Sequence, residues 1–408
     1  MSHPDPYPMA VKKILILNSH SPNIGDIAIL QATLIHMRCL FPQAGIKVHC
    51  SHPELTSKHL KADDVEFTPY AWPIFETAHA QPFKDSILAG SRFAANLLRV
   101  LLFRMSGKGI RGPSQLSDYM EADLLICVGG GYMSWDYGFL RPFCDFFVAK
   151  MLGKRIILYG HSIGPFGGLL NRAICGFAFR LPDLIITREQ KSADYLADLG
   201  IKGVCVTADM AFSLPPIKAK PRKGRQIRIV MCPSRWPPLK SANQKRYTDF
   251  IRELSERLVK EHCAEIILHP TTPGDMEFHR SLKPILPKTC RYIEEIRSPM
   301  DIAGSLSGCD FIISSRMHLI ILGSLSSAPF IGLGWGHKME EISKMLCDPS
   351  CSMPADALDG QSVDKAIDII RQREIMRMKI DERQPALRKA AERNAEILKS
   401  RLETWGLA

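Results

Sequence analysis

The sequence has no uninterrupted apolar run of the roughly 18 residues that a membrane-spanning helix needs. Its first residues, MSHPDPYPMAVKK, lack the apolar segment of a signal peptide. The twelve cysteines form no C-x-x-C pair, and several of them, such as Cys127, Cys205 and Cys232, lie inside apolar strand-like runs. Such cysteines are expected to be small buried side chains in a reducing cytoplasm, rather than disulfides or zinc ligands.

Several motifs of cofactor and metal chemistry are also missing. The three glycines at 129–131, which follow a predicted strand, do not form a G-x-G-x-x-G nucleotide fingerprint, and the chain contains no H-E-x-x-H and no D-x-D. No lysine- and arginine-rich run with interleaved aromatic residues is present, which argues against nucleic-acid binding. We therefore expect neither a metal nor another cofactor. The net charge of +11 instead suits phosphorylated substrates or an acidic membrane surface.

Buried-strand segments alternate with helical segments along most of the chain, which predicts an α/β fold. With 408 residues, the chain is long enough for two domains. Both are expected to be Rossmann-like and to face a central cleft, as in GT-B enzymes. The expected parts are an N-terminal domain over 1–212, a proline-rich basic linker over 213–225, a C-terminal domain over 226–375, and a terminal helix over 376–408 that packs back on the N-terminal domain.

Residues 70–117 do not follow this alternation and are interpreted as a variable insert. Within the insert, residues 84–105 have an amphipathic helical pattern that carries several arginines. Two interpretations of this pattern remain open. The helix either lies on the anionic inner face of a membrane, which would make the protein a peripheral one, or packs on its own domain.

The segment from Cys309 to Glu340 is the most informative one. Residues 311–313 predict a buried strand, 317–326 a helix and 328–334 the next strand, which together make one β-α-β unit. Ser314 and Ser315 are expected to cap the helix. Ligands of open α/β sheets bind at the carboxyl ends of strands, so this turn is a candidate binding site.

Arg316 and His318 lie in that turn, among apolar neighbours that make a charged or polar side chain costly. Residues two apart on a helix point to different sides. Both can therefore serve one site only if Arg316 lies in the turn and His318 in the first helical turn. Arginine binds carboxylate or phosphate through its fork, and histidine transfers protons near neutral pH.

Polar and glycine residues follow several other strands. They are Asn18 to Asp26, Gly129 to Gly131, Gly160 to Pro165, Arg188 and Glu189, Asp209, and His269 with Pro270. Gly25 permits a tight turn before a helix over 27–40, while Asp26 either caps that helix or holds a substrate hydroxyl. Asp209 is interpreted as a structural hydrogen-bonding residue. Together these strand ends predict one rim of a cleft.

The order and spacing of these pieces resemble the polysaccharide pyruvyl transferase family over roughly residues 13 to 347. The matching pieces are N-x-x-x-x-N-I-G-D-x-A-I-L at 18–30, D-L-L-I-C-V-G-G-G at 123–131, G-H-S-I-G-P at 160–165, I-T-R-E at 186–189, T-A-D-x-A-F at 207–212, H-P at 269–270 and S-S-R-M-H at 314–318. The resemblance implies transfer of pyruvate from phosphoenolpyruvate, a co-substrate rather than a cofactor, to two hydroxyls of a saccharide, in exopolysaccharide or cell-wall glycan synthesis. Whether that acceptor is lipid-linked stays open.

The resemblance also implies roles for individual residues. His318 is the expected acid/base, and Arg316 and Arg188 are expected to hold the phosphate and carboxylate of the donor, with Ser315 beside them. Lys338 either neutralises phosphate or is a solvated helix start. The acceptor side is expected to contain Asn18, Gly25, Asp26, Gly129, Gly130 and Gly131, and also His161 and His269, for both of which a structural role is the alternative.

Two other functions fit the same pattern. A GT-B glycosyltransferase or a sugar-nucleotide epimerase would share the two-domain architecture. A saccharide- or membrane-surface-binding protein without catalytic activity would keep the fold but not need Arg316. Binding of a nucleotide sugar rather than phosphoenolpyruvate would favour the first, and acceptor binding without turnover the second.

Overall fold

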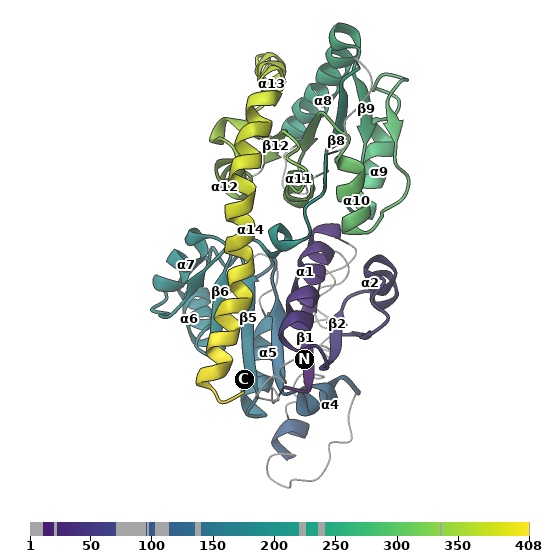
Figure 1. The fold of residues 1–408 in the computed structure, drawn as a ribbon. Coiled ribbons are helices and arrows are strands. Elements are labelled where there is room, and N and C mark those ends of the chain that lie inside the picture. Colours follow the sequence, from purple (N-terminus) through teal and green to yellow (C-terminus); the bar gives the residue numbers. More distant parts are fainter. Residues whose placement is uncertain are drawn as a thin grey trace. The chain divides into compact units, whose positions relative to one another are not determined.

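A computed structural model describes residues 11–19, 23–70, 95, 98–102, 114–134, 140–219, 226–235, 241–334 and 337–407. The chain divides into two compact units, each built on its own parallel sheet with helices on both faces (Figure 1). Unit 1 comprises Met1–Ser21, Ile29–Met210 and Ala390–Ala408, and unit 2 comprises Pro22–Ala28 and Ala211–Lys389. The described part of the chain contains no helix that is long and apolar enough to cross a membrane.

Unit 1 contains a seven-stranded sheet in the order β3-β2-β1-β4-β5-β6-β7. Its strands are β1 (Lys13–Ser19), β2 (Gly45–Cys50), β3 (Val65–Pro69), β4 (Leu124–Val128), β5 (Arg155–His161), β6 (Leu184–Thr187) and β7 (Cys205–Val206). Its helices are α1 (Ile24–Leu40) from Ile29 onward, α2 (Pro53–Leu60), α4 (Ser114–Glu121), α5 (Leu140–Met151), α6 (Leu169–Ala178) and α7 (Gln190–Ala197). All paired strands are parallel, so their carboxyl ends share one edge of the sheet.

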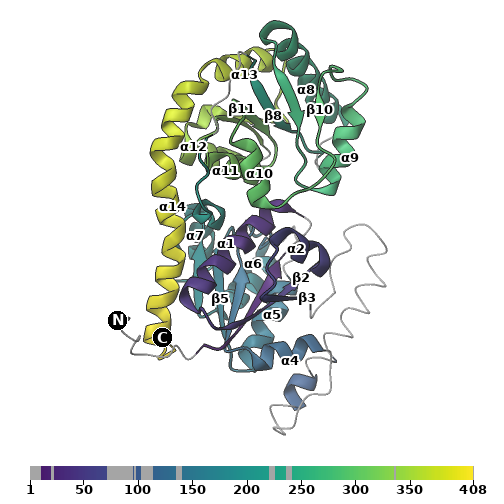
Figure 2. The ribbon, with the colours of Figure 1, turned by 45° about the vertical axis from the view of Figure 1, so that its right-hand side comes forward.

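The core of unit 1 lies on both faces of the central strands. All five residues of β4 are buried, which matches the continuous apolar run expected for a parallel strand covered on both sides. Side chains from α4, from α5 and from the C-cap of α6 pack on one face, for example Tyr119, Phe146 and Phe179. On the other face His36 of α1 contacts Tyr159 of β5, and Figure 2 shows α14 on that side as well.

Unit 2 contains a six-stranded sheet in the order β10-β9-β8-β11-β12-β13. Its strands are β8 (Arg228–Cys232), β9 (Glu265–Leu268), β10 (Arg291–Tyr292), β11 (Phe311–Ser314), β12 (Phe330–Gly334) and β13 (Ser352–Pro354). Its helices are α8 (Ser241–His262), α9 (Pro273–Leu282), α10 (Pro299–Leu306), α11 (Met317–Ser324), α12 (His337–Leu346) and α13 (Ser362–Arg371). The central strands β8 and β11 pair in parallel, so Cys232 and Ser314 end side by side.

The last helix, α14 (Arg373–Thr404), contributes to both units. Its residues from Ala390 onward belong to unit 1, where Asn394 accepts a hydrogen bond from the hydroxyl of Thr207 at 3.2 Å. The predicted return of the terminal helix to the N-terminal domain is therefore confirmed. The helix begins at Arg373 rather than at 376, and only Gln372 separates it from α13.

Three predicted boundaries need correction. The N-terminal part of unit 1 ends at Met210 rather than at 212, and residues from Ala390 onward also belong to this unit. Helix α1 begins at Ile24 rather than at 27, so Gly25 and Asp26 lie in its first turn and not in a loop. Residues 22–28 belong to unit 2, although they precede most of unit 1 in the sequence. Most of the predicted insert over 70–117, and of the amphipathic segment over 84–105, lies outside the described residues.

Candidate functional site

Arg316 and His318 lie where the sequence pattern placed them, at the junction of β11 and α11. Arg316 is the N-cap residue of α11, with an extended backbone, and His318 lies in the first helical turn. The predicted cap by Ser314 and Ser315 is wrong, because Arg316 itself is the N-cap residue. Instead, the hydroxyl of Ser314 accepts a hydrogen bond from the backbone N–H of Arg316 at 2.9 Å. Ser315 shares a hydrogen bond of 2.6 Å with the hydroxyl of Tyr247, so it is not available as a cap.

The guanidinium of Arg316 is paired with Asp275, in the first turn of α9. Nη2 donates to Oδ1 of Asp275 at 2.7 Å, and Nε lies 3.1 and 3.2 Å from the two carboxylate oxygens. Nη2 also donates to the hydroxyl of Thr272 at 3.2 Å. The Asp275 side chain is 1% exposed and that of Arg316 is 25% exposed. This geometry fixes the plane of the fork, while Nη1 has no hydrogen-bond partner among the described residues.

Asp275 is the main site residue that sequence reasoning missed. Its position in T-T-P-G-D predicts only a helix start, because Thr272 caps α9 and Pro273 follows. The carboxylate also accepts hydrogen bonds from the hydroxyls of Ser234 at 2.8 Å and Thr271 at 2.9 Å. Burial alone would raise the pKa of Asp275, but the Arg316 guanidinium and these donors outweigh it and hold the pKa below its usual range.

The first turn of α1 lies against His318. A Cβ atom added to Gly25 would lie 2.6 Å from Cγ of His318, which leaves no room for any side chain at this position. The backbone N–H of Ile24 donates to the carbonyl of Thr271 at 3.2 Å. Gly25 therefore contacts the proposed acid/base itself, and its role is close packing rather than the predicted tight turn.

Three sequence motifs thus meet in unit 2: N-I-G-D at 23–26, H-P with the following threonines at 269–272, and S-S-R-M-H at 314–318. Each one includes or precedes a helix N-terminus, those of α1, α9 and α11. Backbone N–H groups and the helix dipole favour anions at such ends. Together with Arg316, these three N-termini make the region suited to a small anion.

His269 lies beside this group but is buried, at 4% exposed. Its Nδ1 is 3.1 Å from the carbonyl of Pro270, and burial lowers its pKa. This geometry supports the structural alternative for His269. Asp26 lies in the first turn of α1 and Lys338 is the second residue of α12, and both are half-buried. Their predicted contacts with acceptor and phosphate stay predictions.

In unit 1, Arg188 follows β6 and is buried, with 5% of its side chain exposed. Its Nη1 donates to Oδ2 of Asp209 at 2.5 Å, and its Nε donates to the hydroxyl of Ser162 at 2.6 Å. The motifs at 160–165, 186–189 and 207–212 therefore converge at one sheet edge. Arg188 belongs to unit 1 and Arg316 to unit 2, so their joint action on one donor stays a prediction.

Ser162 lies at the centre of G-H-S-I-G, which has the spacing of a hydrolase nucleophile elbow. Its hydroxyl donates to the carboxylate of Glu189 at 2.8 Å and accepts from Arg188. The imidazole of the neighbouring His161 is instead directed to the carbonyl of Cys127, at 2.9 Å. Among the described residues, no histidine is hydrogen-bonded to Ser162 to act as the base of a nucleophile.

His161 and Asn18 lie in the core of unit 1 rather than on an open surface. The imidazole of His161 is fully buried and packs edge-on against Tyr132 at 5.5 Å between ring centroids. Asn18, at 1% exposed, donates from Nδ2 to Asp145 at 3.1 Å and to Cys127 at 2.8 Å. These contacts favour structural roles for both residues, so direct contact with an acceptor stays a prediction.

The three glycines at 129–131 follow β4. A Cβ atom at Gly129 would lie 2.5 Å from the carbonyl oxygen of Gly160, and one at Gly130 would lie 2.7 Å from the ring of Tyr132. The backbone at Gly129 is closely approached, as predicted, but the neighbouring group is the backbone of strand β5 and not a ligand. The first two glycines thus pack the end of the sheet, and ligand contact by Gly129, Gly130 or Gly131 stays a prediction.

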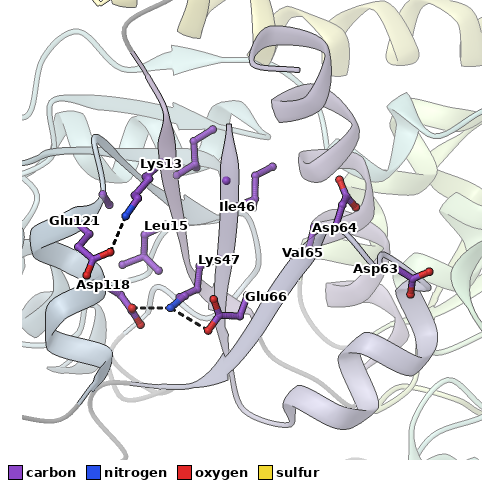
Figure 3. Close-up of a pocket in the computed structure, with 13 residues that line it drawn as sticks. Lys13, Leu15, Ile46, Lys47, Asp63, Asp64, Val65, Glu66, Asp118 and Glu121 are labelled. Carbon is purple, nitrogen blue, oxygen red and sulfur yellow. Dashed lines mark hydrogen bonds and ion pairs between the residues drawn. The ribbon is translucent and has the colours of Figure 1, made fainter. Parts of the chain in front are cut away.

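A cavity of about 610 Å³ lies elsewhere in unit 1, as Figure 3 shows. It opens at the amino ends of the strands, where Lys13 begins β1 and Gly45 begins β2. Both of its lysines are engaged, Lys13 with Glu121 at 2.8 Å and Lys47 with Asp118 at 2.8 Å. None of the predicted site residues lines this cavity, and both of its lysines are held in ion pairs, so it is not the candidate site.

The buried histidines of unit 1 predict how stability depends on pH. Burial lowers the pKa of His161 to about 3 and that of His36 to about 4, against about 6.5 in the unfolded chain. The stability from the neutral ring is complete above pH 6.5 and is lost as the pH falls toward the folded pKa. At pH 5 each of these buried rings would lower the free energy of unfolding by about 2 kcal/mol relative to its value above pH 6.5.

His161→Gln keeps an N–H donor for the Cys127 carbonyl but does not titrate. We expect the free energy of unfolding of this variant to fall by about 2 kcal/mol less than that of the wild type between pH 7 and pH 5. Chemical denaturation at both pH values measures this difference. Equal losses in the two proteins would show that His161 is not held neutral.

Comparisons with known proteins agree with this arrangement. The chain is 21% identical over 388 residues to the amylovoran biosynthesis protein AmsJ of Erwinia amylovora, covering 86% of this chain and 91% of that protein. Its fold is similar to that of MnaA from S. aureus, solved with UDP (TM-score 0.63, 13% identity, 97% and 98% of the two chains). It is also similar to MurG from Acinetobacter baumannii (TM-score 0.51, 9% identity, 95% and 99%).

The structural likenesses show the fold: two Rossmann-like domains of the GT-B type. The sequence profile of the polysaccharide pyruvyl transferases matches residues 23–337, a span that includes the anion-suited region of unit 2 and the Arg188 cluster of unit 1. The chain therefore belongs to the polysaccharide pyruvyl transferase family.

Proposed function

We propose that this protein transfers pyruvate from phosphoenolpyruvate to two hydroxyls of a saccharide, forming a cyclic ketal and releasing inorganic phosphate. Membership of the family supports the transfer of a pyruvyl group. The name of the relative from Erwinia amylovora, an amylovoran biosynthesis protein, supports a saccharide as the acceptor. The reaction needs an anion site and a proton donor close together.

The observation that carries the proposal is the meeting of Arg316, His318 and three helix N-termini in unit 2. Phosphoenolpyruvate is small and carries several negative charges. Arg316 presents Nη1, and the first turn of α11 presents backbone N–H groups, to such a ligand. His318 lies in the first turn of the same helix, which places the proposed proton donor beside the proposed anion contacts.

In the proposed reaction, His318 in its protonated form donates a proton to the methylene carbon of the donor, which becomes a methyl group. The positive charge that develops on the adjacent carbon is quenched by the first acceptor hydroxyl, which loses its proton. The second hydroxyl then attacks the same carbon and loses its proton as the carbon–oxygen bond to phosphate breaks. Of the two protons lost by the hydroxyls, one returns to His318 and the other leaves with the phosphate. Phosphoenolpyruvate and a diol thus give a ketal and phosphate, and no redox step or external reactant is required.

Arg188 and Lys338 are proposed to assist with the carboxylate and phosphate of the donor, and Asp26 with an acceptor hydroxyl. Nη1 and Nε of Arg188 are already hydrogen-bonded to Asp209 and Ser162. Arg188 would therefore contact the donor through Nη2, or act indirectly by positioning Asp209 and Ser162. Lys338 lies in the first turn of α12. Asp26 is adjacent to Gly25, and so comes from the helix turn that contacts His318.

Incubation with phosphoenolpyruvate and candidate saccharides, followed by mass spectrometry, tests the proposal. The product must gain the mass of one pyruvate less one water, and phosphate must be released only when both substrates are present. Thermal stabilisation by a nucleotide sugar but not by phosphoenolpyruvate would instead favour a glycosyltransferase or epimerase. Acceptor binding without any turnover would favour a non-catalytic binding protein.

A further inference from the structure

We infer that Asp275 is a positioning residue that sets the orientation of Arg316 toward the donor phosphate. The inference rests on the proposed function, because that function makes Arg316 a ligand of the donor. It assigns to Asp275 a task that the sequence pattern, a helix start, does not indicate. Asp275 acts through Arg316 and need not contact the donor.

The contacts between the two side chains leave the guanidinium little freedom. Asp275 accepts from Nε and from Nη2, and the same Nη2 reaches the hydroxyl of Thr272. A planar fork held at two of its three nitrogens has a fixed plane and a fixed direction. The third nitrogen, Nη1, is thus directed by Asp275 even though Asp275 does not touch it.

Asp275 is itself held in place. Ser234 and Thr271 donate to its carboxylate, and its own backbone N–H donates to Thr272 at 3.1 Å. The backbone N–H of Ser234 donates to the hydroxyl of Tyr247 at 3.2 Å, and that hydroxyl bonds Ser315, next to Arg316. Residues after β8, in α8 and before α9 therefore hold Asp275 in place, and the same hydrogen-bond network includes Ser315, the neighbour of Arg316.

The negative charge of Asp275 opposes the binding of an anionic donor. The direction in which donor affinity changes when this charge is removed therefore tests the role of Asp275. The Asp275–Arg316 pair is neutral as a whole, so the donor meets directed N–H groups rather than an uncompensated cation. Replacing Asp275 with asparagine would leave the site one charge more positive. If net charge controlled binding, the donor would bind more tightly, whereas loss of orientation would weaken binding.

We therefore expect D275N to raise the KM for phosphoenolpyruvate about tenfold or more, with a smaller change in kcat. Calorimetry should show weaker binding of both phosphoenolpyruvate and inorganic phosphate. Ser234→Ala removes one support of the carboxylate and should change KM in the same direction by a smaller factor. Glu265→Gln is the matched control, because Glu265 pairs with Arg228 at 2.8 Å in the same sheet but at the amino ends of its strands.

Unchanged or tighter donor binding by folded D275N would overturn the inference, and so would a lower Tm with unchanged KM. If D275N does not fold, Asp275→Glu keeps the charge, shifts the carboxylate by one methylene, and must raise KM. A wild-type protein that binds phosphate but does not turn over phosphoenolpyruvate would overturn only the proposed reaction, and phosphate affinity then decides the role of Asp275. A wild type that binds neither anion would overturn both.

Discussion

His318→Ala is expected to lower the turnover of phosphoenolpyruvate by about 10²- to 10⁴-fold, the usual contribution of a positioned acid or base. The physical reason is that the methylene carbon of the donor is a weak base that accepts a proton only from a closely placed group. The imidazole lies in the first turn of α11, next to Arg316. Phosphate release in the presence of a saccharide measures the loss, and it should appear mainly in kcat.

Two further measurements complete this test. Donor binding by the variant should be retained, because the expected anion contacts come from Arg316 and from backbone N–H groups. His52→Ala, at an exposed histidine before α2 in unit 1, serves as the control and should keep full activity. Substantial turnover by His318→Ala would show that another group transfers the proton.

Gly25→Ala is expected to reduce the same activity about 100-fold while leaving the protein folded. The new methyl group would overlap the imidazole of His318, because its position is 2.6 Å from Cγ of the ring. Either the ring or the first turn of α1 must move, and a displacement of about 1 Å at a catalytic group can cost two orders of magnitude. The steric clash should also cost about 1–3 kcal/mol of stability, which denaturant titration measures.

Gly304→Ala is the matched control for this variant. Gly304 lies in α10 of the same unit, and a Cβ atom there would meet nothing within 4 Å. Alanine at an open helical position should stabilise the protein by up to about 1 kcal/mol and leave the activity unchanged. Equal activities of Gly25→Ala and Gly304→Ala would refute the proposed role of the contact between Gly25 and His318.

Much of the fold follows from local patterns. The continuous apolar runs of β4 and β11 indicate strands buried on both faces, and the alternation with helical segments indicates parallel sheets. The turn that carries Arg316 and His318 was predictable for the same reason, since strand and helix periodicities change at this point. Boundaries were less certain: α1 begins at Ile24 because its first turn is held by Thr271, a residue far along the chain.

The sequence by itself determined the two sheets, the residues at their strand ends and the resemblance to pyruvyl transferases, because each depends on neighbouring residues or on their order. The tertiary structure alone decided which of those residues meet. Asp275 lies 41 positions before Arg316, and six of the seven strands of the unit 1 sheet lie between Gly25 and His318 in the sequence. Pairing of a buried charge and exclusion of a single methyl group are contacts in space, and no local pattern encodes them.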